Sequence, residues 1–214
     1  MSEPFIAAMG PAAQSMPDLT GCVVDHRYQL LTMLGAGAFG VVYRAIDVDP
    51  DVEPDCMDVA VKIISKVSRT LAEHEMVRRE VAFQIEVSHH RNVVQIYDAF
   101  EDDDYFYIIL DLCKGGSLYE QVCVNETYLG KDELLRGAFL SLIDAVQACH
   151  KAHVYHRDLK PENIMTNEDG SEVYLADFGL ATDKNVVTDL RVGTEGYMSP
   201  GQPILHAHDQ RNHC

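Results

Sequence analysis

The sequence predicts an α+β fold organised in two lobes. Three observations support this class: β-prone segments dominate the chain up to residue 112, a long helical pattern follows at 132–152, and short strands and polar loops come after it. The chain has 214 residues, enough for two small lobes with a real core. We expect a tail over 1–27, a first lobe over 28–110, a second lobe over 111–200 and a further tail over 201–214.

The first lobe is expected to open with a pair of strands. Residues 1–27 are rich in Pro, Gly, Ala and Ser, which predicts a flexible tail. Residues 28–48 alternate apolar and small residues around a glycine cluster, a pattern typical of two strands joined by a glycine-rich turn. An acidic loop broken by proline follows at 49–57, and residues 58–64 form a strand with one lysine inside it.

A helix and two further strands complete this lobe. Residues 70–88 have the helical period, and two strands are expected near 93–100 and 105–112, separated by an acidic turn. The helix is expected to place four side chains on one face: Met76, Glu80, Phe83 and Val87.

The second lobe begins with the clearest helix of the chain, over 132–152. Residues 153–182 follow as short strands and loops. The helix carries a broad apolar stripe made of Leu134, Leu135, Ala138, Phe139, Leu142, Ile143 and Val146.

Charge and cysteine content limit the classes of partner and compartment. The formal net charge is −17, from 34 acidic and 17 basic residues, so charge-driven binding to nucleic acid or anionic lipid is not expected, whereas a basic protein partner is favoured electrostatically. Six cysteines without a CxxC pair indicate a reduced, intracellular protein, cytoplasmic and/or nuclear. The sequence contains neither a signal-peptide pattern nor an apolar run long enough to span a membrane.

The glycine cluster LGAGAFGVV is the first candidate site. Gly35, Gly37 and Gly40 would let backbone N–H groups approach phosphate oxygens without obstruction by side chains. The spacing alone is weak evidence, because glycine turns are common. A dinucleotide-binding fold would require a helix directly after the third glycine, and the β-prone VVYRAI argues against it.

Lys62, in the strand VAVK, has two interpretations. It is either an ordinary lysine reaching water or a cation placed over phosphates, which would need a carboxylate to hold it. We favour Glu80 as this carboxylate because it interrupts an apolar helical stripe. Glu73, Glu75 and Glu86 remain alternatives.

The stretches VYHRDLKPENIM (154–165) and LADFGLAT (175–182) carry the strongest functional signal. Phosphoryl transfer requires charge neutralisation, a bridging metal and an oriented hydroxyl. Asp158, Asn163 and Asp177 together supply oxygen ligands of the kind that Mg²⁺ prefers and a carboxylate that accepts a proton. A chance match to both stretches, in this order and after VAVK, is very improbable.

From about Tyr28 to Pro200 the chain resembles a eukaryotic protein kinase, since GAGAFGVV, VAVK, HRDLKPEN, DFG and GTEGYMSP occur in the family's order. The resemblance implies a bilobal fold with a β-rich N-lobe, an incomplete helical C-lobe, and ATP and Mg²⁺ as cofactors. It implies a hinge at 111–113 with Leu110 as gatekeeper; for Cys113 a buried structural thiol remains the alternative. The implied nucleotide-binding residues are Leu34, Gly35, Ala36, Gly37, Gly40, Val42, Ala60, Lys62, Asp111 and Cys113.

The resemblance also implies catalytic roles. Lys62 would contact the α- and β-phosphates while paired with Glu80, and Asp158 would be the catalytic base. Lys160 would steady the γ-phosphate. The implied Mg²⁺ ligands are Asn163 and Asp177.

The lysine of HRDLKPEN and the segment GTEGY resemble the serine/threonine class, with Thr194 near the hydroxyl of a protein substrate. Arg157 beside the catalytic aspartate implies control by an upstream kinase that phosphorylates the activation loop, with Thr188 as the first candidate. The alternative for Thr188 is an ordinary polar-loop threonine. EVSHHRNVV and YMSP look similar to fungal meiosis- and nutrient-linked kinases.

The last residues depart from the family pattern. The family continues with glutamate where Gly201 stands, and residues 201–214 lack the apolar content of a helix core. We expect a truncated kinase whose 132–152 helix is partly uncovered, and a disordered tail in preference to a metal site at His206, His208, His213 and Cys214. The first hypothesis for function is a serine/threonine kinase that transfers the γ-phosphate of Mg·ATP to a protein hydroxyl. The alternatives are a catalytically impaired fragment that binds ATP or protein, and an unstable fragment with no function of its own.

Overall fold

The computed structural model separates into two compact units. The first comprises residues 1–88 and 94–113, and the second comprises 89–93 and 114–214. The structure describes residues 16–37, 40–51, 58–67, 69–184 and 192–198. Thr188 and the segment 201–214 lie outside the described residues, so the expectations for them stay predictions.

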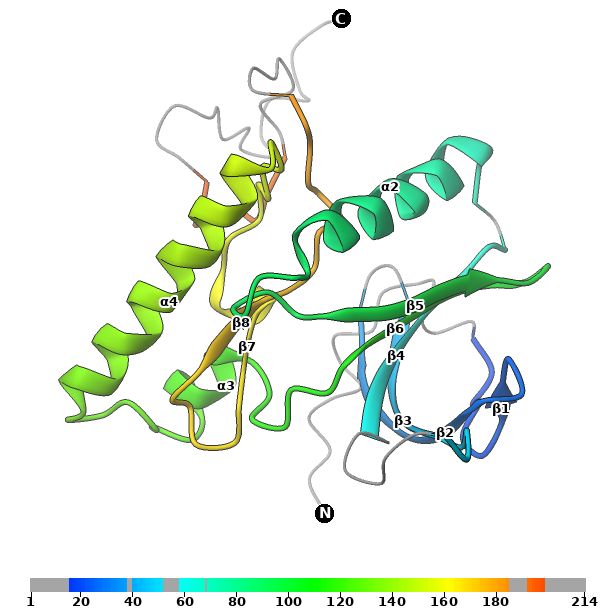
Figure 1. Cartoon of the computed structure of the whole chain (residues 1–214), viewed down its shortest axis with the longest axis horizontal. Coiled ribbons are helices and arrows are strands. Elements are labelled where there is room, and N and C mark those ends of the chain that lie inside the picture. The colour runs from blue at the N-terminus through cyan, green and yellow to red at the C-terminus, as the bar shows by residue number, and fades with distance from the viewer. Residues whose placement is uncertain (1–15, 38–39, 52–57, 68, 185–191, 199–214) are drawn as a thin grey trace, which may run out of the picture. The chain divides into compact units, whose positions relative to one another are not determined.

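In its described residues, the first unit is an antiparallel six-stranded sheet with one α-helix (Figure 1). The strand order is β1-β2-β3-β4-β6-β5, and each neighbouring pair is antiparallel. The elements are β1 (Val23–Val24), β2 (Tyr28–Ala36), β3 (Val41–Asp47), β4 (Asp58–Ser65), α2 (Leu71–Val87), β5 (Ile96–Glu101) and β6 (Tyr105–Asp111). The strands and the helix expected for this lobe are confirmed, and β1 was not predicted.

The tail expected over 1–27 is too long, because its last part is ordered. The backbone N–H of Gly21 donates to the carbonyl of Leu30 at 2.8 Å, and the N–H of Leu30 donates to the carbonyl of Cys22 at 2.9 Å. The N–H of Leu19 donates to the Tyr43 hydroxyl at 3.1 Å, and Leu19 packs against the main core. Two-residue β1 is too short to leave a period in the sequence, which is why it escaped prediction.

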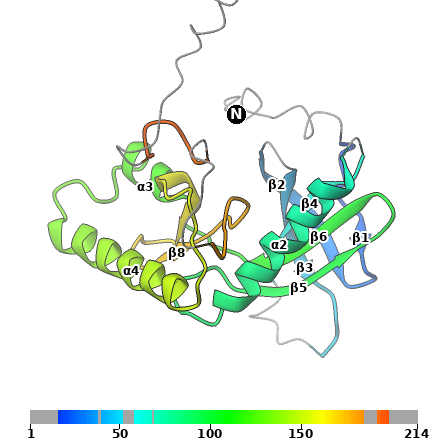
Figure 2. The same ribbon diagram turned by 90° about the horizontal axis from the view of Figure 1, so that it is seen from above.

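Alternation along β4 decides which side chains face the helix. Val59, Val61 and Ile63 are buried in the core cluster that also holds Leu30, Tyr43 and Ile109. Ile64 packs on the other face, with Val77 of α2 and with Phe106 and Ile108 of β6. Because successive side chains of a strand point to opposite faces, Lys62 shares the face of Ile64, the one on which α2 packs (Figure 2).

Helix α2 begins at a capping box formed by Thr70 and Glu73. Its buried side chains are Val77, Glu80, Gln84 and Val87. The expected face was therefore right for Glu80 and Val87 and wrong for Met76, which is 54% exposed. Val77 takes the inward place because it sits one turn before Glu80 and Val81, the residues that follow on the sheet-facing side.

The second unit contains two α-helices and a small sheet among its described residues. Residues 89–93 belong to this unit, against the expected continuous first lobe: the N–H of Leu175 donates to the carbonyl of Asn92 at 2.8 Å, and Asn92 Nδ2 donates to the carbonyl of Val173 at 2.9 Å. The elements are α3 (Leu118–Cys123), α4 (Asp132–Lys151), the 3₁₀ helix η3 (Pro161–Asn163), β7 (Ile164–Thr166) and β8 (Val173–Leu175).

The apolar stripe expected on helix α4 is partly packed in a core cluster and partly exposed. Leu134, Ala138 and Leu142 pack in a cluster with Tyr128, Ile164 and Val173. Leu135, Phe139 and Ile143 are exposed in this chain. The stripe is wider than the surface that β7 and β8 offer. Among the described residues, no helix combines the length and the apolar content that a membrane span requires.

Replacing Gly40 by alanine should destabilise the chain by about 1–3 kcal/mol, because an added Cβ would lie 2.1 Å from the backbone oxygen of Ile63, which cannot move without disturbing β4. Gly37→Ala is the matched control. At that position an added Cβ meets no atom within 4 Å, so we expect a change within about 0.5 kcal/mol. Urea unfolding followed by circular dichroism measures both, and equal effects would contradict the packing argument.

Candidate active site

The first unit brings Lys62 and Glu80 together. Lys62 Nζ lies 2.6 Å from Glu80 Oε1, and the two side chains are only 16% and 9% exposed. A charge buried to this extent is costly unless it is paired, so each of these residues requires the other. The pairing selects Glu80 among the candidate carboxylates.

The three alternative carboxylates have other positions. Glu73 is the third helical residue of α2 and closes the capping box with Thr70. Glu75 pairs with Arg78 of its own helix at 3.7 Å, and Glu86 is exposed. These observations leave Glu80 as the carboxylate bound to Lys62.

The glycine segment joins β2 to β3. Gly35 is the register partner of Val42, and the N–H of Gly37 donates to the carbonyl of Gly40 at 2.8 Å. An added Cβ at Gly35 or Gly37 would meet no atom within 4 Å, whereas Gly40 is packed directly against Ile63. Of these three positions, packing within the chain therefore requires glycine only at 40, and the space around 35 and 37 fits the close approach of a phosphate ligand. Leu34 and Ala36 lie on the same strand, β2.

The residues expected around an adenine base lie on β4 and at the end of β6. Ala60 is buried and is the register partner of Leu110, and Asp111 is the last residue of β6. Cys113 is half-buried. Burial, assisted by the charge of Asp111, raises the pKa of the Cys113 thiol to about 12, so this thiol is protonated at neutral pH and is a poor nucleophile.

In the second unit, three side chains converge on the carboxylate of Asp158. The Thr194 hydroxyl donates to Oδ1 at 2.6 Å, while Lys160 Nζ and Asn163 Nδ2 lie 2.8 and 2.9 Å from Oδ2. Lys160 also donates to the Thr194 hydroxyl at 2.8 Å. Burial alone would raise the pKa of Asp158, but the hydrogen bonds from Lys160 and Thr194 outweigh it and hold the pKa below its ordinary value. Asp158 is therefore an ionised, oriented carboxylate at neutral pH.

Asn163 and Asp177 are linked through the backbone. The Ala176 N–H donates to the carbonyl of Asn163 at 2.9 Å, so Asp177 directly follows the residue that is bonded to Asn163. Both side-chain hydrogen bonds of Asn163 use Nδ2, which leaves Oδ1 as the atom that could bind a metal. The described residues contain no group of three His, Cys, Asp or Glu side chains that could hold a metal. An amide oxygen and one carboxylate instead fit Mg²⁺, which keeps several waters or takes substrate oxygens.

His156 and Phe178 are structural members of this site that the sequence did not single out. Nε2 of His156 donates to the carbonyl of Ala176 at 2.9 Å, and Nδ1 accepts the N–H of Asp158 at 3.3 Å. Burial lowers the pKa of His156, in agreement with a neutral imidazole that both donates and accepts. The ring also meets Phe178 edge-on at 5.0 Å. The sequence contained a signal for both: each is adjacent to a charged residue of a motif, and a loop that buries such a residue needs neighbouring side chains to hold it in place.

Two residues of the site adopt left-handed backbone conformations. Arg157 has φ 65° and Asp177 has φ 61°. Such a conformation costs on the order of 1–3 kcal/mol for a residue other than glycine. Arg157 Nε donates to the carbonyl of Leu180 at 2.7 Å, a bond that helps to hold the loop in place. The expected pairing of Arg157 with a phosphate on Thr188 concerns a residue outside the described ones.

Comparison with known proteins identifies a matching family and several similar proteins. Residues 28–210 match the family model of the protein kinase domain. The chain is 38% identical over 182 residues to the negative regulator of sexual conjugation and meiosis of Schizosaccharomyces pombe, a match covering 85% of this chain and 38% of that protein. The serine/threonine-protein kinase ksp1 of the same yeast is 36% identical over 183 residues, covering 82% and 37%.

A plant protein is also similar in sequence to this chain. Calcium-dependent protein kinase 8 of Arabidopsis thaliana is 33% identical over 189 residues, covering 86% of this chain and 34% of that protein. The chain spans just over a third of the length of these curated relatives. The expected similarity to a fungal meiosis-linked protein is confirmed by the first of them.

Replacing Lys160 by methionine should raise the pKa of Asp158, because it removes a hydrogen bond and a positive charge that favour the carboxylate. An ionised Asp158 with a lowered pKa stabilises the fold above its unfolded pKa of about 3.9, and this stabilisation is lost as pH falls through the folded pKa. In the variant the loss should therefore begin at higher pH. A pH titration of the Asp158 carboxyl carbon by NMR measures the shift, with Lys131→Met as control; an unchanged pKa would contradict the assigned role of Lys160.

Proposed function

Because this chain belongs to the protein kinase family, we propose that it transfers the γ-phosphoryl group of ATP to a serine or threonine hydroxyl of a protein substrate. The observation that carries the proposal is the state of Asp158, which is buried and ionised and accepts hydrogen bonds from Lys160 and Thr194. A substrate hydroxyl would donate to this carboxylate and be oriented by it. Its proton would pass to Asp158 as the oxygen bonds to the γ-phosphorus and the bond from that phosphorus to the bridging oxygen of ATP breaks, with ADP as the leaving group.

The cofactor proposed for this reaction is ATP with Mg²⁺. When bound, Mg·ATP supplies the phosphoryl group and a positive centre that stabilises the charge of its oxygens. In the first unit, Lys62 would bind phosphate oxygens while Glu80 holds its side chain in place. The open space at Gly35 and Gly37 supports close contact between the backbone and phosphate.

The second unit would supply the remaining groups. Asn163, through Oδ1, and Asp177 would hold Mg²⁺, because hard cations prefer amide and carboxylate oxygens. Lys160 would contact the γ-phosphate, and its position beside Asp158 supports this. The short backbone link between Asn163 and Ala176 supports a common role for the two ligands.

Regulation by an upstream kinase that phosphorylates Thr188 is part of the proposal. Arg157 holds Leu180 and occupies a strained conformation directly before Asp158. A phosphate that drew the guanidinium toward itself would therefore act on the loop that carries the catalytic carboxylate. Phosphopeptide analysis of the active protein would test Thr188 as the modified residue.

A second candidate function is protein binding without phosphoryl transfer. It is supported by the exposure of Leu135, Phe139 and Ile143 along one side of α4 in this chain, since contiguous exposed apolar side chains favour a protein contact. Nucleotide binding with no transfer to any peptide would favour this function over the first.

Replacing Asp158 by asparagine should reduce phosphoryl transfer by about 100-fold or more, because it removes the proton acceptor. It should leave binding of a fluorescent ATP analogue with Mg²⁺ within about threefold, since the proposed contacts of Asp158 are with the hydroxyl substrate. Transfer of radiolabelled phosphate to a serine/threonine peptide library is the activity measurement.

Replacing Lys62 by methionine is the companion variant, and it should weaken nucleotide binding about tenfold or more. Lys66→Met is unsuitable as its control because Lys66 contacts Glu101, so the exposed Lys131 is replaced by methionine instead. Failure of the unmodified chain to bind Mg·ATP at millimolar concentration would refute the nucleotide-dependent function.

A further inference from the structure

Helix α2 must keep one rotation about its axis for Glu80 to reach Lys62, yet few apolar contacts fix that rotation. The cluster beneath the helix contains the buried Val77 and the partly buried Val81 of α2, with Ile64, Phe106 and Ile108 of the sheet. Val87 is buried at the last position of the helix. Leu71, Met76 and Ile85 of the same helix are exposed. The apolar packing under the middle of the helix is therefore narrow, and polar contacts add to it: Gln84 Nε2, for example, donates to the backbone oxygen of Val94 at 3.1 Å.

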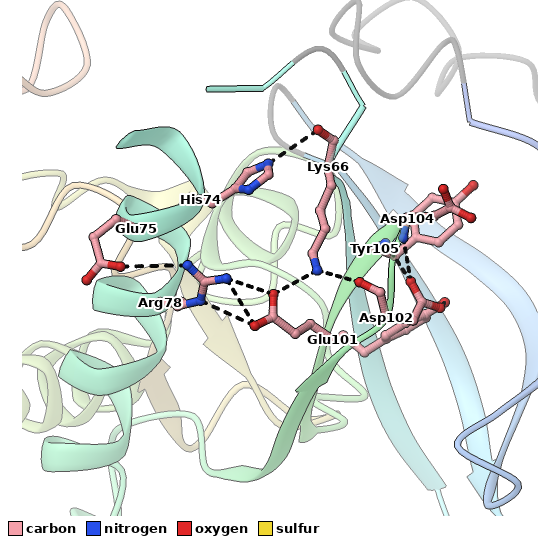
Figure 3. A network of polar contacts seen from close by, with 9 residues as sticks. Lys66, His74, Glu75, Arg78, Glu101, Asp102, Asp104 and Tyr105 are labelled. Atoms are coloured by element: carbon pink, nitrogen blue, oxygen red, sulfur yellow. Dashed lines mark hydrogen bonds and ion pairs between the residues drawn. The ribbon is translucent and has the colours of Figure 1, made fainter. Parts of the chain in front are cut away.

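A polar network on the other flank of the helix supplies such a contact (Figure 3). We name it the Arg78 staple and define it as Arg78, Glu101 and Lys66. Arg78 Nη2 lies 3.1 Å from both carboxylate oxygens of Glu101, and its Nε donates to Oε1 at 3.3 Å. Lys66 Nζ binds the same carboxylate at 2.8 Å and also donates to the backbone oxygen of Asp102. The staple thus joins α2 to β5 and to the residue that follows β4.

The staple lies on an aromatic surface, the ring of Phe106. Lys66 Nζ is 4.7 Å and the Arg78 guanidinium carbon is 5.5 Å from the centre of the Phe106 ring. The His74 ring meets the same ring edge-on at 5.5 Å, and His74 Nε2 lies 3.3 Å from the backbone oxygen of Lys66. The Lys66 side chain is only 15% exposed. Charges held against an aromatic face and partly shielded from water interact more strongly than exposed ones.

The positions of Arg78 and Glu80 on the helix make the staple relevant to the candidate site. At 3.6 residues per turn, Glu80 lies about 60° from Val77 on one side and Arg78 lies about 100° from it on the other. The two side chains therefore straddle the buried residue and reach different strands, β4 for Glu80 and β5 for Arg78. A roll of the helix that withdraws Glu80 from Lys62 must also pull Arg78 out of its bidentate contact with Glu101.

We propose that Arg78 and Glu101 are positioning residues for the Lys62–Glu80 ion pair and thereby for nucleotide binding. The nucleotide part of this inference rests on the proposed function, whereas the effect on the ion pair does not. Glu75, which also lies 3.7 Å from Arg78, cannot substitute for Glu101 because it sits on the same helix and is 65% exposed.

The first experiment tests, in the absence of nucleotide, whether Arg78 holds the Lys62–Glu80 ion pair together. The rate of acylation of Lys62 by an amine-reactive ester, followed by mass spectrometry of the full chain, should rise about threefold to tenfold in Arg78→Ala, because a lysine that is no longer held by Glu80 is more accessible to the reagent. Glu101→Gln is the milder second variant, should Arg78→Ala fail to fold. Arg44→Ala is the matched control: Arg44 forms a comparable ion pair with Asp58 at 2.7 Å, and its side chain is 43% exposed against 48% for Arg78. An unchanged Lys62 rate in both staple variants would overturn the proposal.

The second experiment tests whether Arg78 affects nucleotide binding by positioning Glu80 or only by stabilising the fold. Arg78→Ala should weaken binding of Mg·ATP about threefold to tenfold in the unmodified chain but less than about twofold in a Glu80→Ala background, because its effect passes through Glu80. Equal losses in the two backgrounds would overturn the positioning role. If Glu80→Ala itself leaves ATP binding unchanged, the proposed role of the ion pair in nucleotide binding fails, while the acylation result still decides whether the staple holds Glu80.

Discussion

The buried ion pair between Lys62 and Glu80 is the contact on which the first unit depends. Each of the two charges lies in a largely dry position, where it would cost several kcal/mol if left alone. The alternation of β4 puts Lys62 on the face that α2 covers, and the capping box at Thr70 fixes where the helix begins. The pair therefore links a strand position to a helix position, and small changes in the packing of α2 act directly on a group suited to bind phosphate.

In the second unit, hydrogen bonds compensate the cost of burying a charge. Asp158 is buried, and its carboxylate is satisfied by donors from Thr194, Lys160 and Asn163. The neutral His156 connects the loop of Asp158 to the segment that carries Asp177. The left-handed conformations of Arg157 and Asp177 persist because these surrounding contacts over-determine the backbone. Two of the left-handed residues of the chain thus lie directly beside or among the residues that the proposed chemistry uses.

The sequence predicted the local elements and the charged site residues better than it predicted packing. Lys62, Asp158 and Asn163 sit in short motifs, so short-range pattern was enough to find them. Glu80 was only favoured over three other glutamates by its place in a helical stripe, and the structure was needed to select it. The inward face of α2 was misplaced by one residue at Met76, because Met and Val are both apolar and only the sheet surface decides between them. The exposure of Phe139 on α4 was likewise not predictable from the sequence. Periodicity identifies the apolar side of a helix, but it does not say which part of that side another element covers.

The segment 89–93 has a consequence for how the chain can be divided. It lies between α2 and β5 in the sequence, yet its bonds run to β8: Val93 forms a parallel bridge with Leu175, and Asn92 bonds both Val173 and Leu175. His90 also lies 3.4 Å from Asp144 of α4. The polypeptide thus changes unit at 88/89, 93/94 and 113/114. Cleavage of the backbone after Cys113 would place Asn92 and Val93 on a different fragment from β8, which would keep only β7 beside it. The two units are consequently not modules that recombination can exchange with one crossover.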